Sequence, residues 1–385
     1  MKLVTRALPS LLAFVLCGAL SACVSPRRRL DISSLTPWGT RAANKVSLLT
    51  FNVENLFDLK DDPEKNDETF LPLALKNASP ALQNKCRVQN DSSYRQSECL
   101  EYDWSRAAYN RKLSRITDVV AQVNEGWGPD ILILQEVENR EVLEDWRKIH
   151  LSRMGYHTIS HAEGPDERGI DVAVISRLPL VKGPVLHPVD FSNVHGIDPK
   201  TIRPTRGILE THLQLPGGDR LAVFAVHFPS QGAPTELRKV AVETLLNVTR
   251  QMPPGTHVVT GGDFNITARE EWTQKYFRDL ISRHFEVSHL VGCAKCAGTT
   301  YYKDNNSWSF FDVLLFSKDL APGSGGWEVD RNSIRVVNSS VYQMSRFGTP
   351  ARFDGGRGPV GVSDHWPMYA EIRLHPSREP AKDTQ

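Results

Sequence analysis

The sequence predicts an α/β fold in which two packed β-sheets are flanked by helices. Short apolar runs recur along the chain, each next to a polar cluster, and near-continuous apolar runs are typical of strands covered on both faces. Longer segments with apolar residues at helical spacing lie between these runs. The alternation occurs in two halves, residues 45–215 and 219–375, and no obvious linker separates them.

Seven apolar runs account for the predicted strands. They span residues 45–55, 130–139, 169–177, 220–231, 257–265, 309–317 and 361–372. The first predicted helix covers 104–125, where Leu113, Ile116 and Val120 recur at helical spacing. The second covers 234–252 and opens with Pro234 and Thr235.

Residues 1–22 have the organisation of a secretory signal. Lys2 and Arg6 precede a short apolar run, and small residues surround Cys23 in the stretch LSAC. This ending resembles the lipobox of bacterial lipoproteins, which implies cleavage before Cys23 and acylation of its sulfur and of the new amino terminus. Several acyl chains form a stable membrane anchor. The alternative is an ordinary cleaved signal that happens to end in Cys.

The segments that follow Cys23 complete the predicted organisation. Residue 24 is Val rather than Asp, which under the lipoprotein sorting rule favours the outer membrane. Residues 23–44 are polar and lack a sustained period, so we expect a flexible tether after the lipidated cysteine. Residues 45–375 form one domain and 376–385 a disordered tail. We expect an exported, membrane-anchored monomer, and no protein partner is evident.

The charge of the chain is nearly balanced. Removing Lys2 and Arg6 with the signal takes the basic count from 46 to 44 against 45 acids, a formal balance of −1. Proteins that bind nucleic acid tightly through its phosphates usually have a basic excess. If nucleic acid is handled here, it is bound briefly or with a metal ion that supplies positive charge.

Four cysteines remain beyond the signal and the anchor, and they fall in two close pairs. Cys86 with Cys99, and Cys293 with Cys296, are expected to form local disulfides in an exported chain. A zinc site would require all four to converge from distant segments. A redox role for the CAKC stretch lacks the βαβ context of such motifs.

Polar residues gather where the apolar runs end. In the stretch HVVTGGDFN, Asp263 and Asn265 lie two residues apart and so face the same side of an extended chain, and Gly261 and Gly262 are expected to clear space for a phosphate. A strand that ends in an Asx turn is the alternative for this stretch alone. The full set of such residues is Asn52, Glu136, Asp171, His227, Asp263, Asn265, Asp312, Asp364 and His365.

Each of these residues has a structural explanation when taken singly. Asn52 would cap a turn, and a lone histidine such as His227 is most often a core residue. Asp364 and His365 are adjacent, so both serve one site only if they lie in a loop. Because every member of the set borders an apolar run, we predict that the set converges on one rim of the sandwich.

The chemistry of this set is metal-assisted attack on a phosphoester. Carboxylate and amide oxygens suit Mg²⁺, Mn²⁺ or Ca²⁺, and no His-Cys cluster indicates zinc. A divalent ion polarises the phosphoryl oxygen and stabilises charge on the leaving oxygen. Two histidines near carboxylates supply groups for proton transfer near neutral pH.

The stretches TFNVENLFD, LQEVEN, RGIDVAVISR, HFPSQ, GGDFN, SWSFFDVLLFS and SDHWPM occur in the order found in the endonuclease/exonuclease/phosphatase superfamily, whose fold is that of pancreatic deoxyribonuclease. The resemblance covers residues 45–375 and is closest to a bacterial branch of predicted secreted nucleases. It implies a four-layer α/β/β/α sandwich of the DNase I-like type.

The resemblance also implies roles for individual residues. Glu136 is the main metal ligand, with Asn52 and Asp364 beside it, and Asn52 also contacts the phosphate. Asp263 activates the attacking water and Asn265 binds the scissile phosphate. His365 contacts the phosphate, transfers a proton and is oriented by Asp312. His227 stands where deoxyribonuclease-like members have a second catalytic histidine. Asp171 and Arg206 are expected to support the rim through ion pairs.

These observations predict a lipid-anchored, divalent-metal-dependent phosphodiesterase, with DNA or RNA as the expected substrate. A phosphatase or sphingomyelinase-like diesterase is the first alternative, and a non-catalytic surface lipoprotein is the second. Residues 58–103 form a long insertion that either shapes the substrate mouth or is a surface loop with one disulfide.

Overall fold

The computed structural model describes residues 43–375. The predicted signal, Cys23, the tether as far as residue 42 and the tail from 376 lie outside the described residues, so the predictions for them stay predictions. Within residues 43–375, no helix has both the length and the apolar character needed to cross a bilayer.

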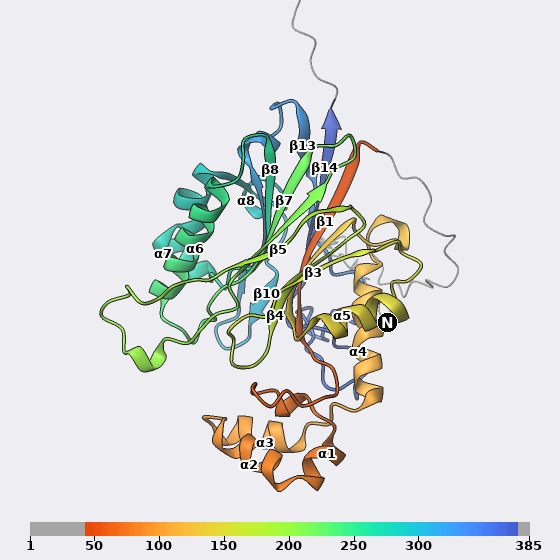
Figure 1. Ribbon diagram of the computed structural model, residues 1–385, viewed down its shortest axis with the longest axis vertical. Helices are drawn as coiled ribbons and strands as arrows, with labels where there is room; N and C mark the ends of the chain where they lie inside the picture. Colours follow the sequence, from red (N-terminus) through yellow and green to blue (C-terminus); the bar gives the residue numbers. More distant parts are fainter. Residues whose placement is uncertain (1–42, 376–385) are drawn as a thin grey trace, which may run out of the picture.

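Two six-stranded sheets form the centre of the molecule, as the sequence predicts (Figure 1). The first has the order β13-β14-β1-β2-β4-β3 and the second β5-β6-β7-β8-β12-β9. The strands of the first sheet are β1 (Lys45–Leu56), β2 (Ile131–Val137), β3 (Thr158–His161), β4 (Asp171–Ser176), β13 (Gly326–Val336) and β14 (Met368–His375). Those of the second are β5 (Leu180–His187), β6 (Ile208–Gln214), β7 (Arg220–His227), β8 (Thr256–Asp263), β9 (Phe285–Val287) and β12 (Asp312–Ser317).

Helices cover the outer face of each sheet, which gives the predicted four layers (Figure 1). Leu113 and Ile116 of α4 (Arg106–Val120) and Trp146 of α5 (Arg140–Ile149) are buried in one apolar cluster with the outer face of the first sheet. Leu245 of α6 (Thr235–Arg250) is buried against the second sheet. Shorter helices are α7 (Ala268–Gln274) and α8 (Ser288–Val291), and β10 (Thr300–Tyr302) pairs with β11 (Ser307–Ser309).

The inner faces of the two sheets share one apolar core, and Gly261 and Gly262 belong to this contact. A Cβ at Gly261 would lie 2.6 Å from Ile133 Cδ1 of the facing sheet, and a Cβ at Gly262 would overlap the Val226 carbonyl on the neighbouring strand. The expectation that these glycines clear space for a phosphate is therefore wrong. They allow β8 to pack closely against the protein itself.

Two parallel strand pairs bring the polar strand ends to one rim. β1 runs parallel to β2 with α4 between them in the chain, and β7 runs parallel to β8 with α6 between them. His227 and Asp263 are register partners, and Asp263 is also the partner of Asp312 on β12. The carboxyl ends of parallel strands lie at the same edge of a sheet, so the topology collects these residues.

Two predicted strands differ in their details. The last strand begins only at Met368, and residues 361–367 form a loop attached through the bridges Ala351↔Ser363 and Thr300↔His365. The run 309–317 is divided, because regular pairing on β12 starts at Asp312. The loop confirms the condition under which Asp364 and His365 can face one site.

The insertion is helical rather than a loop. It contains α1 (Leu73–Ala78), α2 (Pro80–Val88) and α3 (Ser93–Glu101), which lie together below the sandwich in Figure 1. Both predicted disulfides are present, Cys86–Cys99 between α2 and α3 and Cys293–Cys296 in the loop before β10. The buried Lys76 ammonium fixes this helical unit, because it donates to the carbonyls of Cys99 (2.5 Å) and Tyr102 (2.6 Å).

Candidate active site

Asn52 connects the two sheets at the rim. Its Nδ2 donates to Glu136 Oε1 (3.2 Å) and to Asp263 Oδ2 (3.0 Å), while its Oδ1 accepts the Glu54 N–H (3.0 Å). Asn52 ends the regular pairing of β1 with β2, where the register shifts. One neutral amide therefore holds two carboxylates from different sheets at a fixed separation.

The backbone at the rim is strained where the functional side chains leave it. Glu136 (φ 62°) and Asn265 (φ 52°) adopt left-handed conformations, as do Glu54 and Asn55. Such conformations cost about 1–3 kcal/mol for most non-glycine residues and persist when the surroundings impose them. Here the Asn55 N–H donates to Glu136 Oε2 (3.1 Å), so the turn that follows β1 aims the Glu136 carboxylate.

His365 and Asp312 form a buried pair. His365 Nδ1 lies 2.7 Å from Asp312 Oδ2, and Asp312 Oδ1 accepts the Asn52 N–H at 3.3 Å. Burial alone would lower the pKa of His365, but the charge and hydrogen bond of Asp312 hold that pKa well above its usual value. His365 is therefore cationic at neutral pH, and its Nε2 lies 3.9 Å from Asp263 Oδ2.

His227 also lies close to Asp263, but its ring is neutral where that of His365 is cationic. Its Nε2 lies 3.6 Å from Asp263 Oδ2 and 3.9 Å from Glu136 Oε1. Burial lowers the pKa of His227 well below the usual range, and the Arg206 charge lowers it further, so the imidazole is neutral. Within the described chain its buried Nδ1 has no hydrogen-bond partner.

Asp263 lies between the two histidines. Burial raises its pKa to about 7, although the His365 charge acts in the opposite direction. The Asn265 N–H donates to Asp263 Oδ1 (2.8 Å), and Asn265 Nδ2 donates to the Phe228 carbonyl (3.1 Å). A carboxyl group with a pKa near 7 is suited to accept a proton at neutral pH.

Asp364 lies at the outer side of the rim, in a network that the sequence analysis missed. Arg352 bridges Glu54 Oε1 (2.5 Å) and Asp364 Oδ2 (3.3 Å), and burial raises the pKa of Glu54 to about 7. Lys112 Nζ donates to the Glu54 and Val362 carbonyls at 2.8 and 2.7 Å. Glu54 lies within the stretch TFNVENLFD, so the sequence offered a reason to consider it. Lys112 on α4 belongs to no motif that would mark it as a site residue.

Ser363 and Thr299 are further positioning residues that the sequence analysis missed. Ser363 Oγ donates to the Asn52 carbonyl (2.7 Å) and accepts the His365 N–H (3.0 Å). Thr299 Oγ1 accepts the Asp312 N–H at 3.0 Å. Ser363 precedes Asp364 in the motif SDHWPM, and this position could have identified it as a site residue.

Arg206 and Asp171, the two residues expected to support the rim, make contacts in different places. Arg206 is buried beside the rim, where its charge acts on the pKa of His227, and its Nε forms an ion pair with Asp166 (3.2 Å). Asp171 contacts His161 (Nε2–Oδ2 3.4 Å) and the Gly164 N–H (2.9 Å). These contacts of Asp171 support the adjoining loop rather than the catalytic side chains.

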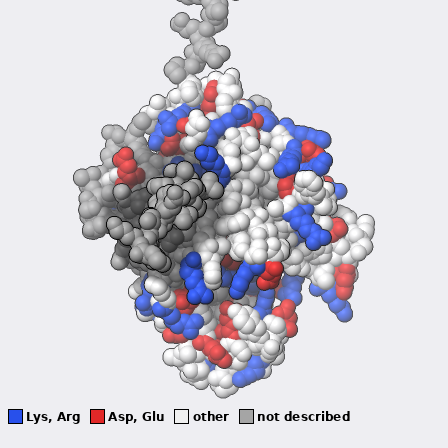
Figure 2. Space-filling model, turned by 180° about the vertical axis from the view of Figure 1, so that it is seen from behind, with Lys and Arg blue, Asp and Glu red and all other residues white. Residues whose placement is uncertain are grey.

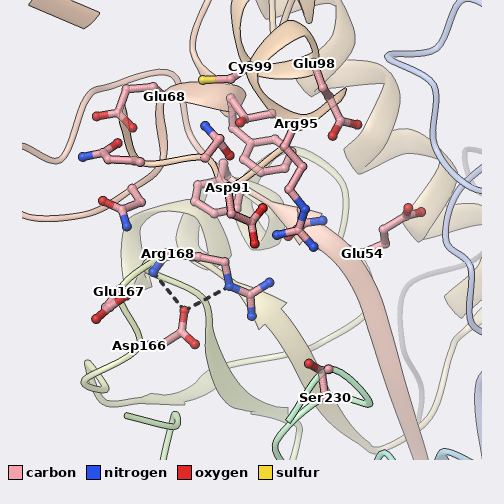
Figure 3. A pocket seen from close by; sticks show the side chains of 18 of the residues that line it. Glu54, Glu68, Asp91, Arg95, Glu98, Cys99, Asp166, Glu167, Arg168 and Ser230 are labelled. Atoms are coloured by element: carbon pink, nitrogen blue, oxygen red, sulfur yellow. Dashed lines mark hydrogen bonds and ion pairs between the residues drawn. The ribbon is translucent and has the colours of Figure 1, made fainter. Parts of the chain in front are cut away.

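A cavity of about 1070 Å³ opens next to the rim, between the insertion and the sandwich. Figure 3 shows Asp91 and Arg95 of the insertion and, across from them, Arg168 held by Asp166. Its wall reaches the rim at Glu54, Arg206 and Arg352. Basic and acidic side chains are interspersed over the face seen in Figure 2, in keeping with the balanced charge of the sequence.

The rim fits a single, open divalent-cation site. Both oxygens of Glu136 accept neutral N–H groups, and no Lys or Arg of residues 43–375 forms an ion pair with it. In that part of the chain, groups of three close potential ligands occur only away from the rim. A divalent ion such as Mg²⁺ commonly keeps several waters and binds one or two carboxylates together with substrate phosphate, so the Glu136 carboxylate suits it. Asn52 turns its Nδ2 toward Glu136 and its Oδ1 toward the Glu54 N–H, so its amide oxygen is not directed at the same ion.

Comparison with known proteins identifies the family and the fold. Residues 82–374 match the sequence model of the Endonuclease/Exonuclease/phosphatase family. No curated protein shows significant sequence similarity to the chain.

Solved structures share the fold at low sequence identity. An endonuclease/exonuclease/phosphatase from Beutenbergia cavernae DSM 12333 is 16% identical with a TM-score of 0.50, over 86% of this chain and 72% of that one. A family protein from Bacteroides vulgatus is 14% identical with a TM-score of 0.50, over 86% and 99% of the two chains. A mannosyl-6-phosphatase from Bacteroides thetaiotaomicron VPI-5482 is 16% identical with a TM-score of 0.51, over 86% and 99%. These similarities establish the common fold.

Proposed function

The chain belongs to the Endonuclease/Exonuclease/phosphatase family and is a phosphoric ester hydrolase; on this premise we propose that it is an exported, lipid-anchored phosphodiesterase that cleaves DNA or RNA. The observation that carries the proposal is the placement of Asp263 between a neutral and a cationic histidine, with Nε2 atoms at 3.6 and 3.9 Å. Export and anchoring rest on the secretory signal and the lipobox-like sequence at Cys23.

Each group at the rim has a distinct part in this proposal. Asp263 accepts the proton of the attacking water, because its pKa near 7 matches that task. His365, kept cationic by Asp312, binds the phosphate and donates a proton toward the leaving oxygen. A divalent cation held by Glu136, with Asp364 and Asn52 nearby, would polarise the phosphoryl oxygen.

The remaining polar groups bind and orient the phosphoester. Neutral His227 offers an uncharged ring next to Asp263, where a second cation would oppose water activation. Asn265 retains a second amide hydrogen beyond the one that the Phe228 carbonyl accepts, and this hydrogen is available to a phosphate oxygen.

The size of the adjoining cavity supports a polymeric substrate. Its volume of about 1070 Å³ is at the upper end of ligand pockets, and the insertion forms its outer wall. Tyr94 and Arg95 on this wall have the chemistry of a stacking and phosphate-binding surface for single-stranded nucleic acid.

A phosphatase or phospholipid diesterase is the second candidate. A structural neighbour with a TM-score of 0.51 is a mannosyl-6-phosphatase, and a membrane anchor would place the domain close to lipid headgroups. A purely binding role is disfavoured by the complete set of acid, amide and histidine groups at the rim.

A substrate panel tests the proposal. The purified protein is incubated with plasmid DNA, RNA, sphingomyelin and a sugar phosphate, each with Mg²⁺ and with chelator. We expect nucleic acid cleavage that requires the cation. Intact nucleic acid together with released lipid headgroup or inorganic phosphate would replace the nuclease proposal by the second candidate.

A further inference from the structure

A second cluster of carboxylates lies in the segment that leads from β1 into the insertion. Asp61, Asp67 and Glu68 each place one oxygen within 4.8 Å of the others. Asp67 and Glu68 are 1% and 2% exposed, so this part of the cluster is removed from solvent. Buried carboxylates are costly unless they are paired or bind a cation.

Asp67 has an unsatisfied oxygen in this cluster. Its Oδ2 accepts the Asp62 N–H (2.9 Å), but its Oδ1 is buried and has no hydrogen-bond partner among the described residues. The side chain thus lacks a partner for a full negative charge.

The local charges do not balance. Lys85 on α2 is the one cation in residues 43–375 that forms an ion pair with the cluster, at 2.7 Å from Glu68 Oε1 and 3.8 Å from Asp61 Oδ1. Three carboxylates and one ammonium leave a charge of −2. A bound divalent cation would neutralise this excess negative charge.

We propose that Asp61, Asp67 and Glu68 form a structural Ca²⁺ site at the base of the insertion. All three ligands offer hard oxygens, from an irregular segment and the first residue of the short 3-10 helix Glu68–Phe70. Ca²⁺ accepts flexible, all-oxygen coordination, whereas Mg²⁺ demands near-ideal octahedral geometry. No nitrogen or sulfur ligand belongs to the cluster, which excludes a typical zinc site. This site is separate from the cation site at Glu136 and does not depend on the proposed substrate.

The position of the site gives the ion a structural consequence. Glu68 is followed by Thr69 and Phe70, all three of which line the cavity, and the Phe70 ring stacks on Phe57 with centroids 4.3 Å apart. Through Lys85 the cluster also contacts α2. A bound Ca²⁺ would thus join the segment after β1 to the helical insertion and stabilise the outer wall of the cavity.

Calorimetric titration of the chelator-treated, purified protein with CaCl₂ tests the site. Four proteins are compared: wild type, Asp67→Asn, Glu136→Gln and Glu64→Gln. Asp67→Asn keeps the shape of the side chain and removes its charge, Glu136→Gln removes the rim ligand, and Glu64→Gln removes an exposed acid three residues from Asp67.

We expect a Ca²⁺ site whose affinity is retained in Glu136→Gln and Glu64→Gln, in addition to any Ca²⁺ that binds at the rim. In Asp67→Asn the affinity should fall by at least about tenfold, since even indirect partners of metal ligands change affinity by about 10–100-fold. Absence of a Ca²⁺ site in wild type, or equal affinity in Asp67→Asn and wild type, would overturn the proposal.

Thermal unfolding checks that the substituted protein remains folded and gives a second readout. With chelator, Asp67→Asn should unfold at the wild-type temperature or above it, because it removes a repelled buried charge. With excess Ca²⁺, wild type should become more stable while Asp67→Asn changes much less, because a ligand that binds only the folded state stabilises it. Equal Ca²⁺ shifts in both proteins would contradict the site.

Discussion

The rim and the insertion cluster both gather buried carboxylates, but the two regions supply different partners for them. At the rim, Asp263 has the Asn52 amide, the Asn265 N–H and two histidines around it. In the insertion, one oxygen of Asp67 accepts the Asp62 N–H and the other has no hydrogen-bond partner among the described residues. At the rim, the hydrogen-bond donors around Asp263 fix the position of its carboxylate. The insertion cluster instead keeps an excess negative charge that a bound cation would neutralise.

This difference means that the rim can combine proton transfer with a cation site, whereas the insertion cluster has groups for cation binding alone. At the rim, the neutral His227 and the cationic His365 each lie within 4 Å of the Asp263 carboxylate. Such an arrangement suits proton transfer. The insertion cluster contains no histidine and has one ammonium nearby. Substitutions at the two places should therefore affect different observables.

The largest effect is expected for Asp263→Asn. The change keeps the shape of the side chain but removes the group that accepts a proton, so phosphodiester hydrolysis should slow by roughly 10²–10⁴-fold. Initial rates with Mg²⁺ measure the loss, and a melting temperature at or above that of wild type would show that the fold persists. An Asp263→Asn protein with wild-type activity would place the proton acceptor elsewhere.

A smaller loss, by about 10²-fold, is expected for Asp312→Asn, which weakens the charge that keeps His365 cationic. The matched control is Asp319→Asn: Asp319 pairs with His257 at 2.5 Å but is half-exposed, and it lies at the opposite end of β12 from Asp312. The control should hydrolyse substrate at the wild-type rate. Equal losses in both proteins would mean that the His365–Asp312 pair has no special part in the reaction.

The smallest effect is expected at Glu210, whose carboxylate accepts hydrogen bonds from three side chains. Burial would raise the pKa of Glu210, but hydrogen bonds from His212, Lys182 and His187 hold it at about 2, below its ordinary value of 4.5. The folded form therefore binds the proton more weakly than the unfolded form. The contribution to stability is complete above the ordinary value and is lost as the pH falls toward 2.

Denaturant unfolding of wild type and Glu210→Gln measures this contribution. The difference in their free energies of unfolding should shrink as the pH is lowered from about 5 to about 3. A difference that stays constant over this interval would show that the three neighbours do not stabilise the Glu210 carboxylate.

The sequence predicted the sandwich and most of the rim because both depend on patterns that it carries directly. Apolar runs give the strands, and polar residues at their ends, such as Asn52, Glu136 and Asp263, are collected by parallel pairing. Asp312 and His365 also meet, since the loop at 361–367 turns toward β12.

The remaining features depend on packing that a linear pattern does not encode. Helices α1–α3 are only six to nine residues long, and their burial is concentrated on Leu82, Cys86 and Cys99 and on the Lys76 side chain, so their periodicity is weak. Gly261 and Gly262 serve contacts with residues distant in sequence. Lys112 reaches the rim from the middle of a helix, through two carbonyl groups.

The most direct test of the account is the rate of phosphodiester hydrolysis by Glu136→Gln and by Asp67→Asn, measured with saturating Mg²⁺ beside their thermal stability. Glu136→Gln should lose activity by orders of magnitude and unfold near the wild-type temperature, whereas Asp67→Asn should keep its activity and lose stabilisation by Ca²⁺. A Glu136→Gln protein that hydrolyses substrate at the wild-type rate would contradict the assignment of the rim as the hydrolytic centre.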